Sequence, residues 1–136
     1  RIAVHVEVCH HLQRTLESIQ SAGVEAGIAI NPASALSLLE DALPWADFVL
    51  VMSVNPGYGG QAFIPEALGK IRRLRQMADG QALDIAVDGG VGLENVVALA
   101  QAGATTLVAG SAIFGQRDRT AAIAELRRAV SVGGEK

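Results

Sequence analysis

One repeat of the pattern that decides the fold is FVLVMSVNPGYGGQ (residues 48–61), which continues as AFIPEALGKIRRL (62–74). Residues 48–52 form a short, continuous apolar run, which is typical of a strand buried on both faces. The apolar residues of 64–74 recur at helical spacing, and Pro65 suits a first helical turn. A strand, a glycine-rich loop and a helix are therefore predicted to follow one another here.

The same pattern recurs along the whole chain. Four further apolar runs lie at residues 2–6, 26–30, 85–87 and 106–109. Apolar residues at helical spacing separate them, at Leu12, Leu16 and Ile19; Leu36, Leu39 and Leu43; Val96, Leu99 and Ala100; and Ile123, Leu126 and Val130. Strict alternation predicts an α/β fold with a parallel sheet, either a (β/α)8 barrel or an open doubly wound sheet. The tail 131–136 is expected to fray.

Composition narrows the class of protein. The length of 136 residues suits one domain, 1–136. Half of the residues are hydrophobic, which excludes intrinsic disorder. No run of about 18 uncharged apolar residues occurs, and the net charge of −3 comes without a basic block. We therefore expect neither a membrane nor a nucleic acid as partner. Cys9 is the only cysteine, so no disulfide can form within the chain and a reducing compartment is favoured. We expect a cytoplasmic protein, with a plastid as the alternative location.

Glycines cluster after three successive predicted strands. Seven of the fifteen lie there, namely Gly57, Gly59, Gly60, Gly89, Gly90, Gly92 and Gly110. Without a Cβ, glycine lets backbone N–H groups approach an anion, and the step from Gly110 to Ser111 is predicted to open a helix. This clustering predicts a phosphate site at the carboxyl ends of the strands. The alternative is that the glycines serve tight turns only.

The loop Asn55–Gln61 is long for a connection between a strand and a helix. A long, glycine-rich loop over a binding face predicts a lid, with a simple surface turn as the alternative. Met52 ends the strand before this loop and is expected to face the same end of the sheet.

Asp88 ends the fourth predicted strand and precedes two glycines. A carboxylate at that position can act as acid, base or metal ligand, and the alternative is an N-cap for the next helix. Asp47 and Asp84 precede their strands, so they are predicted to lie at the opposite end, which serves stability.

Three histidines lie near the start of the chain. Alternation places His5 and Glu7 on one face, where a buried structural pair below the site is favoured over direct chemistry. His10 and His11 follow Cys9, and we expect a solvated helix start there rather than a metal site.

Six stretches match a known family. They are His5-Val6-Glu7, GIAINPA (27–33), VMSVNPGYGGQAFIP (51–65), Lys70-Ile71-Arg72, VDGGV (87–91) and AGSAIFG (109–115). In this order they resemble the ribulose-phosphate 3-epimerases, which are (β/α)8 TIM barrels. The resemblance, rather than periodicity, favours the barrel over the open sheet.

The resemblance implies an enzyme that interconverts ribulose 5-phosphate and xylulose 5-phosphate by metal-assisted proton transfer at C3 between two aspartates. Asp88 matches the second aspartate, which is also a metal ligand; the metal expected is Zn or Fe, with Mn or Co as alternatives. The residues matching the substrate and phosphate loops are Met52, Gly57, Gly59, Gly60, Gly89, Gly90, Gly110 and Ser111.

The chain also departs from the family. The family's stretch with the first aspartate and most metal ligands has no counterpart here, so we expect strands 4 to 8 of a barrel whose first three βα units are absent. The open edges of such a half-shell predict a homo-oligomer or association with the missing segment. Two alternatives remain, a non-catalytic phosphate-binding fragment and a sister epimerase for a hexulose phosphate such as allulose 6-phosphate.

Overall fold

The computed structural model describes residues 1–78 and 80–133, and five strands in it form one parallel sheet. The strands are β1 (Ile2–His5), β2 (Ala26–Ile30), β3 (Phe48–Met52), β4 (Asp84–Asp88) and β5 (Thr106–Val108). Their order in the sheet is their order in the chain. A doubly wound sheet reverses its strand order at a switch point, whereas a barrel does not. The fold is therefore an arc of barrel type.

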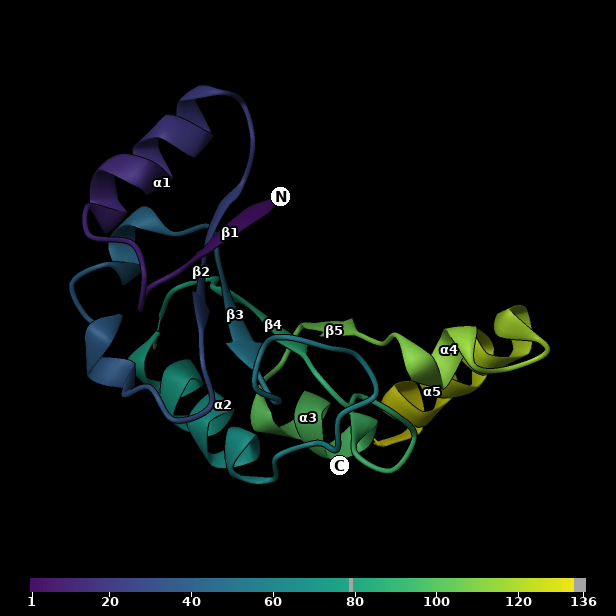
Figure 1. Ribbon diagram of the computed structural model, residues 1–136. Helices are drawn as coiled ribbons and strands as arrows, with labels where there is room; N and C mark the ends of the chain where they lie inside the picture. The colour runs from purple at the N-terminus through teal and green to yellow at the C-terminus, as the bar shows by residue number, and fades with distance from the viewer. Residues whose placement is uncertain (79, 134–136) are drawn as a thin grey trace.

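Helices cover one side of this arc. They are α1 (Leu12–Ser21), α2 (Glu66–Met77), α3 (Val96–Ala102), α4 (Ser111–Phe114) and α5 (Arg119–Gly133). Figure 1 shows α1, α2 and α3 along the outside of the curved sheet and α4 with α5 beyond β5. The predicted fraying is wrong for 131–133, which continue α5, and residues 134–136 lie outside the described part. Among the described residues, no helix is long and apolar enough to cross a bilayer.

The helix predicted from Leu36, Leu39 and Leu43 is wrong. Two short 3-10 turns stand there instead, η1 (Leu36–Leu38) and η2 (Leu43–Trp45). Pro44 lacks an N–H group, so an α-helix that began near Leu36 would lose a backbone hydrogen bond at Pro44. The three leucines are nevertheless buried, Leu36 in the first turn, Leu39 directly after it and Leu43 in the second turn.

The two faces of the sheet differ. The outer face carries the core, and its fully buried side chains include Ile28, Ile30, Val49, Val51, Ile85 and Val87. Side chains of the opposite parity, such as Phe48 and Met52, face the concave side. A Cβ on Gly27 would lie 2.3 Å from the Phe48 ring, so glycine is required for this ring to cross β2.

Charged groups hold the amino ends of the strands together. Arg1 makes ion pairs with Glu25 and Asp84, and its guanidinium lies 4.8 Å from the centre of the Phe48 ring. Thr106 donates to Asp84 at 3.0 Å, and Thr105 donates to it as well. Partial burial raises the pKa of Asp84, but hydrogen bonds from Thr105, Arg1 and Thr106 outweigh it and hold this pKa below its ordinary value.

Asp47 lies at the same end of the sheet. Its carboxylate accepts hydrogen bonds from the Ala26 N–H at 2.8 Å and from the Gln20 amide at 3.1 Å. Both aspartates predicted to serve stability are therefore engaged at the amino ends of the strands.

Candidate active site

A cavity of about 350 Å³ lies at the carboxyl ends of β3, β4 and β5. Every residue proposed from the sequence for the site lines it: Met52, Gly57, Gly59, Gly60, Asp88, Gly89, Gly90, Gly110 and Ser111. The chain thus brings three segments that are far apart in sequence to one hollow.

Asp88 is the last residue of β4 and stands beside Met52 of β3 and Val108 of β5 in the sheet register. Its carboxylate accepts no hydrogen bond from the described residues, and the side chain is partly exposed. The alternative role as an N-cap is wrong, because the next helix, α3, begins only at Val96 after Asn95. A carboxylate without internal partners at the cavity is free to act on a ligand.

The turn after Asp88 requires glycine twice. Gly89 has φ +123° and Gly90 has φ +63°, in the region that other residues rarely adopt. A Cβ on Gly89 would lie 2.8 Å from the Val54 nitrogen, and one on Gly90 would lie 2.6 Å from the Phe63 nitrogen. The turn therefore lies directly against the backbone of the loop that follows β3.

Backbone N–H groups at the rim are available to an anion. Those of Gly90, Gly110 and Ser111 donate to no acceptor within residues 1–78 and 80–133. The predicted helix start at Ser111 is confirmed, but α4 has only four residues, so its dipole is small. Individual amides, rather than a helix dipole, are what this rim offers to a phosphate.

The glycine-rich loop is tied to itself. Gln61 donates from Nε2 to the Asn55 carbonyl at 2.7 Å and to the Tyr58 carbonyl at 2.9 Å. Tyr58 is 77% exposed at the loop's tip. One side chain thus closes the loop at its base, while the proposed lid motion remains a prediction.

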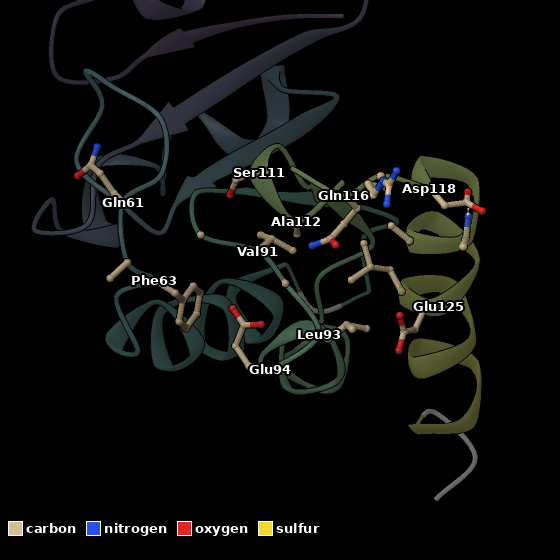
Figure 2. Close-up of a pocket in the computed structure, with 17 residues that line it drawn as sticks. Gln61, Phe63, Val91, Leu93, Glu94, Ser111, Ala112, Gln116, Asp118 and Glu125 are labelled. Atoms are coloured by element: carbon tan, nitrogen blue, oxygen red, sulfur yellow. Dashed lines mark hydrogen bonds between the residues drawn. The ribbon is translucent and has the colours of Figure 1, made fainter. Parts of the chain in front are cut away.

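A second, larger cavity of about 680 Å³ adjoins the first (Figure 2). It shares Gln61, Gly90, Val91 and Ser111 with the first. The charged side chains of its wall are the carboxylates of Glu94, Asp118 and Glu125 and the guanidinium of Arg117. Asp118 is occupied in part, because it accepts a hydrogen bond from the Ala121 N–H at 2.9 Å at the start of α5. Three carboxylates against one guanidinium leave this wall negative, which disfavours phosphate, so the smaller cavity is the better candidate.

Comparison with known proteins identifies the family. Residues 1–114 match the sequence profile of the Ribulose-phosphate 3 epimerase family. The chain belongs to this family.

Curated relatives agree with the profile. The chain is 46% identical over 129 residues to the ribulose-phosphate 3-epimerase of Bacillus subtilis, 51% over 130 to that of Synechocystis and 47% over 128 to that of Escherichia coli. Each match covers 93% of this chain. The chain spans 59%, 56% and 57% of the length of these relatives, in the same order.

Solved structures support the fold. A 3-hexulose-6-phosphate synthase matches with a TM-score of 0.71 at 22% identity, over 94% of this chain and 60% of that one. KGPDC from Streptococcus mutans matches with a TM-score of 0.67 at 12% identity, over 96% and 59%. At such identities the similarity concerns the barrel-type architecture alone.

His5 and Glu7 form the expected pair, with 3.2 Å between Nδ1 and Oε2, although their side chains are 31% and 21% exposed rather than buried. Glu7 also accepts hydrogen bonds from the Asn31 N–H at 2.8 Å and from the Ser34 hydroxyl. Partial burial raises the pKa of Glu7, but these bonds outweigh it and lower the pKa below its ordinary value. The pair thus supports the loop after β2 and does not line the cavity.

Lys70 secures the same loop from α2. Its buried ammonium donates to the carbonyls of Asn31, Pro32 and Ser34, each at 2.7 Å. Burial lowers the pKa of Lys70. Lys70 begins one of the stretches shared with the epimerase family, and the structure gives it a supporting position outside the cavity.

The Cys9-His10-His11 run directly precedes α1, with His11 at the N-cap position. Cys9 donates from Sγ to the Thr15 hydroxyl at 3.3 Å, and His11 precedes the first residue of the helix. His10 is exposed. This arrangement agrees with the expected solvated helix start.

Epimerases of this family are generally metal-dependent, and the donors present here can be compared with that requirement. Within the described part of the chain, no three His, Cys, Asp or Glu side chains form a group that could hold a metal ion. Among the described residues, Asp88 is the only one that lines the smaller cavity with a carboxylate. The described residues therefore do not complete a metal site by themselves.

Three wall residues, Val54, Val91 and Val108, were not anticipated from the sequence. Pro56, Tyr58 and Gln61 also line the cavity and belong to the loop that was expected over the binding face. Val54 and Val91 belong to the shared family stretches, which could have indicated them. Val108 carried no such signal, because its place depends on the pairing of β5 with β4.

Proposed function

We propose that this chain is the part of a ribulose-phosphate 3-epimerase that contributes strands 4 to 8 of the barrel, with the first three βα units supplied by a segment outside it. The proposed reaction interconverts D-ribulose 5-phosphate and D-xylulose 5-phosphate. The observation that carries the proposal is the unpartnered Asp88 carboxylate, placed in a cavity whose rim presents free backbone amides.

The proposed chemistry is a proton transfer at carbon. The C3 proton of the substrate is acidified by the neighbouring C2 carbonyl, and its removal leaves an enediolate. Asp88 exchanges a proton with C3 on one face, as general acid in one direction and general base in the other. A second acid from outside this chain acts on the opposite face, so that the configuration inverts.

The phosphate is proposed to bind at the rim of the cavity. The N–H groups of Gly90, Gly110 and Ser111 donate to its oxygens, as backbone amides do in anion-binding turns. Gly57, Gly59 and Gly60 line the cavity from the opposite loop and leave room for the sugar carbons. Met52 supplies an apolar floor that is 7% exposed.

Asp88 is also proposed as one ligand of a divalent cation, Zn or Fe first and Mn or Co as alternatives. Such a cation requires further donors, which the described residues do not provide near Asp88. Calorimetric titration of the 136-residue chain with Zn²⁺ is expected to show no high-affinity site. Tight binding that survives in Asp88→Asn would show that the ligand assignment is wrong.

Deuterium exchange tests the proposed reaction. Ribulose 5-phosphate is incubated with the protein in D₂O, and the C3 proton is followed by NMR. An active Asp88 exchanges the C3 proton of the epimer whose C3–H bond faces it, even where the second acid is missing, so xylulose 5-phosphate is followed in parallel with ribulose 5-phosphate. Asp88→Asn is expected to lower exchange by about 10³-fold while ribulose 5-phosphate still binds in calorimetry.

A second candidate is a non-catalytic phosphate-binding fragment, which is favoured by the presence of a single carboxylate at the cavity. In that case ribulose 5-phosphate binds but its C3 proton does not exchange. A third candidate, a sister epimerase, is distinguished by faster exchange with allulose 6-phosphate than with ribulose 5-phosphate.

We also propose that the chain associates through its sheet edges. β1 and β5 each pair on one side only, and Ile2 and Val108 on these strands are 49% and 43% exposed. Unpaired parallel edges favour pairing with another chain. Light scattering is expected to show an oligomer, and a monodisperse monomer would contradict this.

A further inference from the structure

Ser53 is the most deeply buried polar side chain near the cavity. It follows β3 directly, is 0% exposed and lies behind the cavity wall rather than in it. A hydroxyl in such a position needs hydrogen-bond partners, because water cannot reach it.

Its partners are the backbone groups that carry Asp88. The Ser53 hydroxyl lies 2.6 Å from the Gly89 carbonyl oxygen and 3.0 Å from the Asp88 carbonyl oxygen. The Ser53 N–H also donates to the Asp88 carbonyl, at 2.9 Å. Since the hydroxyl has one proton, the shorter contact identifies Gly89 as its principal acceptor.

Ser53 also joins this turn to the glycine-rich loop. Its carbonyl accepts a hydrogen bond from the Ile64 N–H at 2.9 Å, just before α2. One residue thus connects the end of β3, the turn after β4 and the far end of the loop.

The turn needs such a restraint because of its composition. Gly89 and Gly90 follow Asp88 directly, and glycine has the widest conformational freedom of any residue. Two adjacent glycines would let the peptide planes next to Asp88 rotate. Rotation of these planes would change the direction of the Asp88 carboxylate and of the Gly90 N–H group together.

We propose that Ser53 is a positioning residue whose buried hydroxyl holds the Asp88–Gly89 backbone and thereby aims both the carboxylate and the rim amide at the cavity. It does not touch the substrate. The inference rests on the proposed function in one respect, namely that Asp88 is the acid–base group.

The test uses three variants of the full 136-residue chain. Ser53→Ala removes the hydroxyl, Ser53→Thr retains it, and Val49→Ala weakens the core on the outer face of the same strand without touching the turn. NMR relaxation gives the order parameters of the Gly89 and Gly90 amides. C3 exchange of ribulose 5-phosphate in D₂O gives kcat and KM.

In Ser53→Ala, the two glycine order parameters are expected to fall from about 0.85 to below about 0.6, the values of rigid and flexible backbone. Exchange is expected to lose at least about tenfold in kcat with KM changed less than about threefold, since oriented groups act on the reacting atom. Ser53→Thr restores both readouts, and Val49→Ala leaves both near those of the unmodified chain. If Ser53→Ala does not fold, Ser53→Cys, with its weaker donor, replaces it and is expected to give intermediate values.

Unchanged order parameters in Ser53→Ala, or an equal fall in Val49→Ala, would overturn the inference. Absence of C3 exchange from both ribulose 5-phosphate and xylulose 5-phosphate in the unmodified chain would contradict the proposed function alone. The order parameters would then still decide whether Ser53 holds the turn.

Discussion

Asp84 and Asp88 lie at opposite ends of the same strand and on the same face of the sheet, yet their surroundings differ in kind. Asp84 accepts hydrogen bonds from Arg1, Thr105 and Thr106, whereas the Asp88 carboxylate accepts none from the described residues. A carboxylate that is fully engaged contributes to stability, and one left free can act on a ligand. The contrast follows the general division of barrels into a stabilising and a functional end.

The contrast extends to the backbone. At the amino end, long charged side chains connect neighbouring strands. At the carboxyl end, the chain turns on glycines that bring backbone against backbone. Substitutions should therefore affect stability at one end and activity at the other.

The largest effect is expected from exchanging the acid at the functional end. Asp88→Asn should lower C3 exchange of ribulose 5-phosphate by about 10³-fold, within the range that one general acid–base group supplies. Its urea midpoint and phosphate affinity should stay close to those of the unmodified chain. Asp84→Asn is the matched control on the same strand, and it should retain exchange. An active Asp88→Asn protein would show that the acid is misassigned.

A glycine substitution tests how tightly the turn after Asp88 packs against the neighbouring loop. Gly90→Ala combines a left-handed φ with a backbone contact at 2.6 Å, so a loss of about 2–4 kcal/mol in unfolding free energy is expected. Gly23→Ala has a similar φ of +76° but open space around it, and it should cost only about 1–2 kcal/mol. Urea denaturation compares the two. Equal losses would mean that the close approach of the turn to Phe63 adds nothing.

At the stabilising end, Asp84→Asn should lower the unfolding free energy by about 1–3 kcal/mol. The change weakens hydrogen bonds from Arg1, Thr105 and Thr106 at a partly buried site. Asp41→Asn is a surface control, because Asp41 is exposed, and it should change stability by less than about 0.5 kcal/mol. Urea denaturation at neutral pH measures both. If Asp84→Asn lowered C3 exchange while the unfolding free energy stayed unchanged, the contrast between the two ends would be wrong.

The smallest effect is expected on the pH dependence of the unfolding free energy. The folded pKa of Asp84 is lowered, so its contribution to stability is complete above the unfolded pKa of about 3.9 and is lost as pH falls through the lower, folded pKa. Unfolding free energy should therefore decrease below about pH 4. Asp84→Asn should show a shallower decrease in the same range, with Glu7, whose pKa is also lowered, accounting for part of the remainder. Parallel pH profiles of the two proteins would contradict this.

Local sequence signals were sufficient for most of the fold. The continuous apolar runs predicted the bounds of β2 and β3 correctly. The residues of both strands that face the helices are buried along the whole length of each strand. The segment with Leu36, Leu39 and Leu43 was wrongly predicted as an α-helix, because its apolar spacing also fits 3-10 turns. Pro44 was the signal against an α-helix that runs through this segment.

The candidate site was predictable where it depends on strand ends and glycines. Asp88 and the glycine turns stand at positions that alternation alone assigns to the carboxyl edge. Ser53 was not predictable, because its importance comes from the register of β3 against β4, which places Met52 beside Asp88. No local pattern specifies which residue of another strand a hydroxyl will reach.

The sequential strand order has a consequence for the time at which the site forms. Each strand joins the one made just before it, so the sheet can grow during synthesis from the amino end. Ser53 leaves the ribosome 35 residues before Asp88, which at about 5–20 residues per second is a delay of roughly 2–7 seconds. Until β4 is made, β3 lacks its partner on that side, and the Ser53 hydroxyl lacks its acceptors on Asp88 and Gly89. The support of the Asp88 backbone therefore cannot form before β4 is made, and until then β3 presents an unpaired edge.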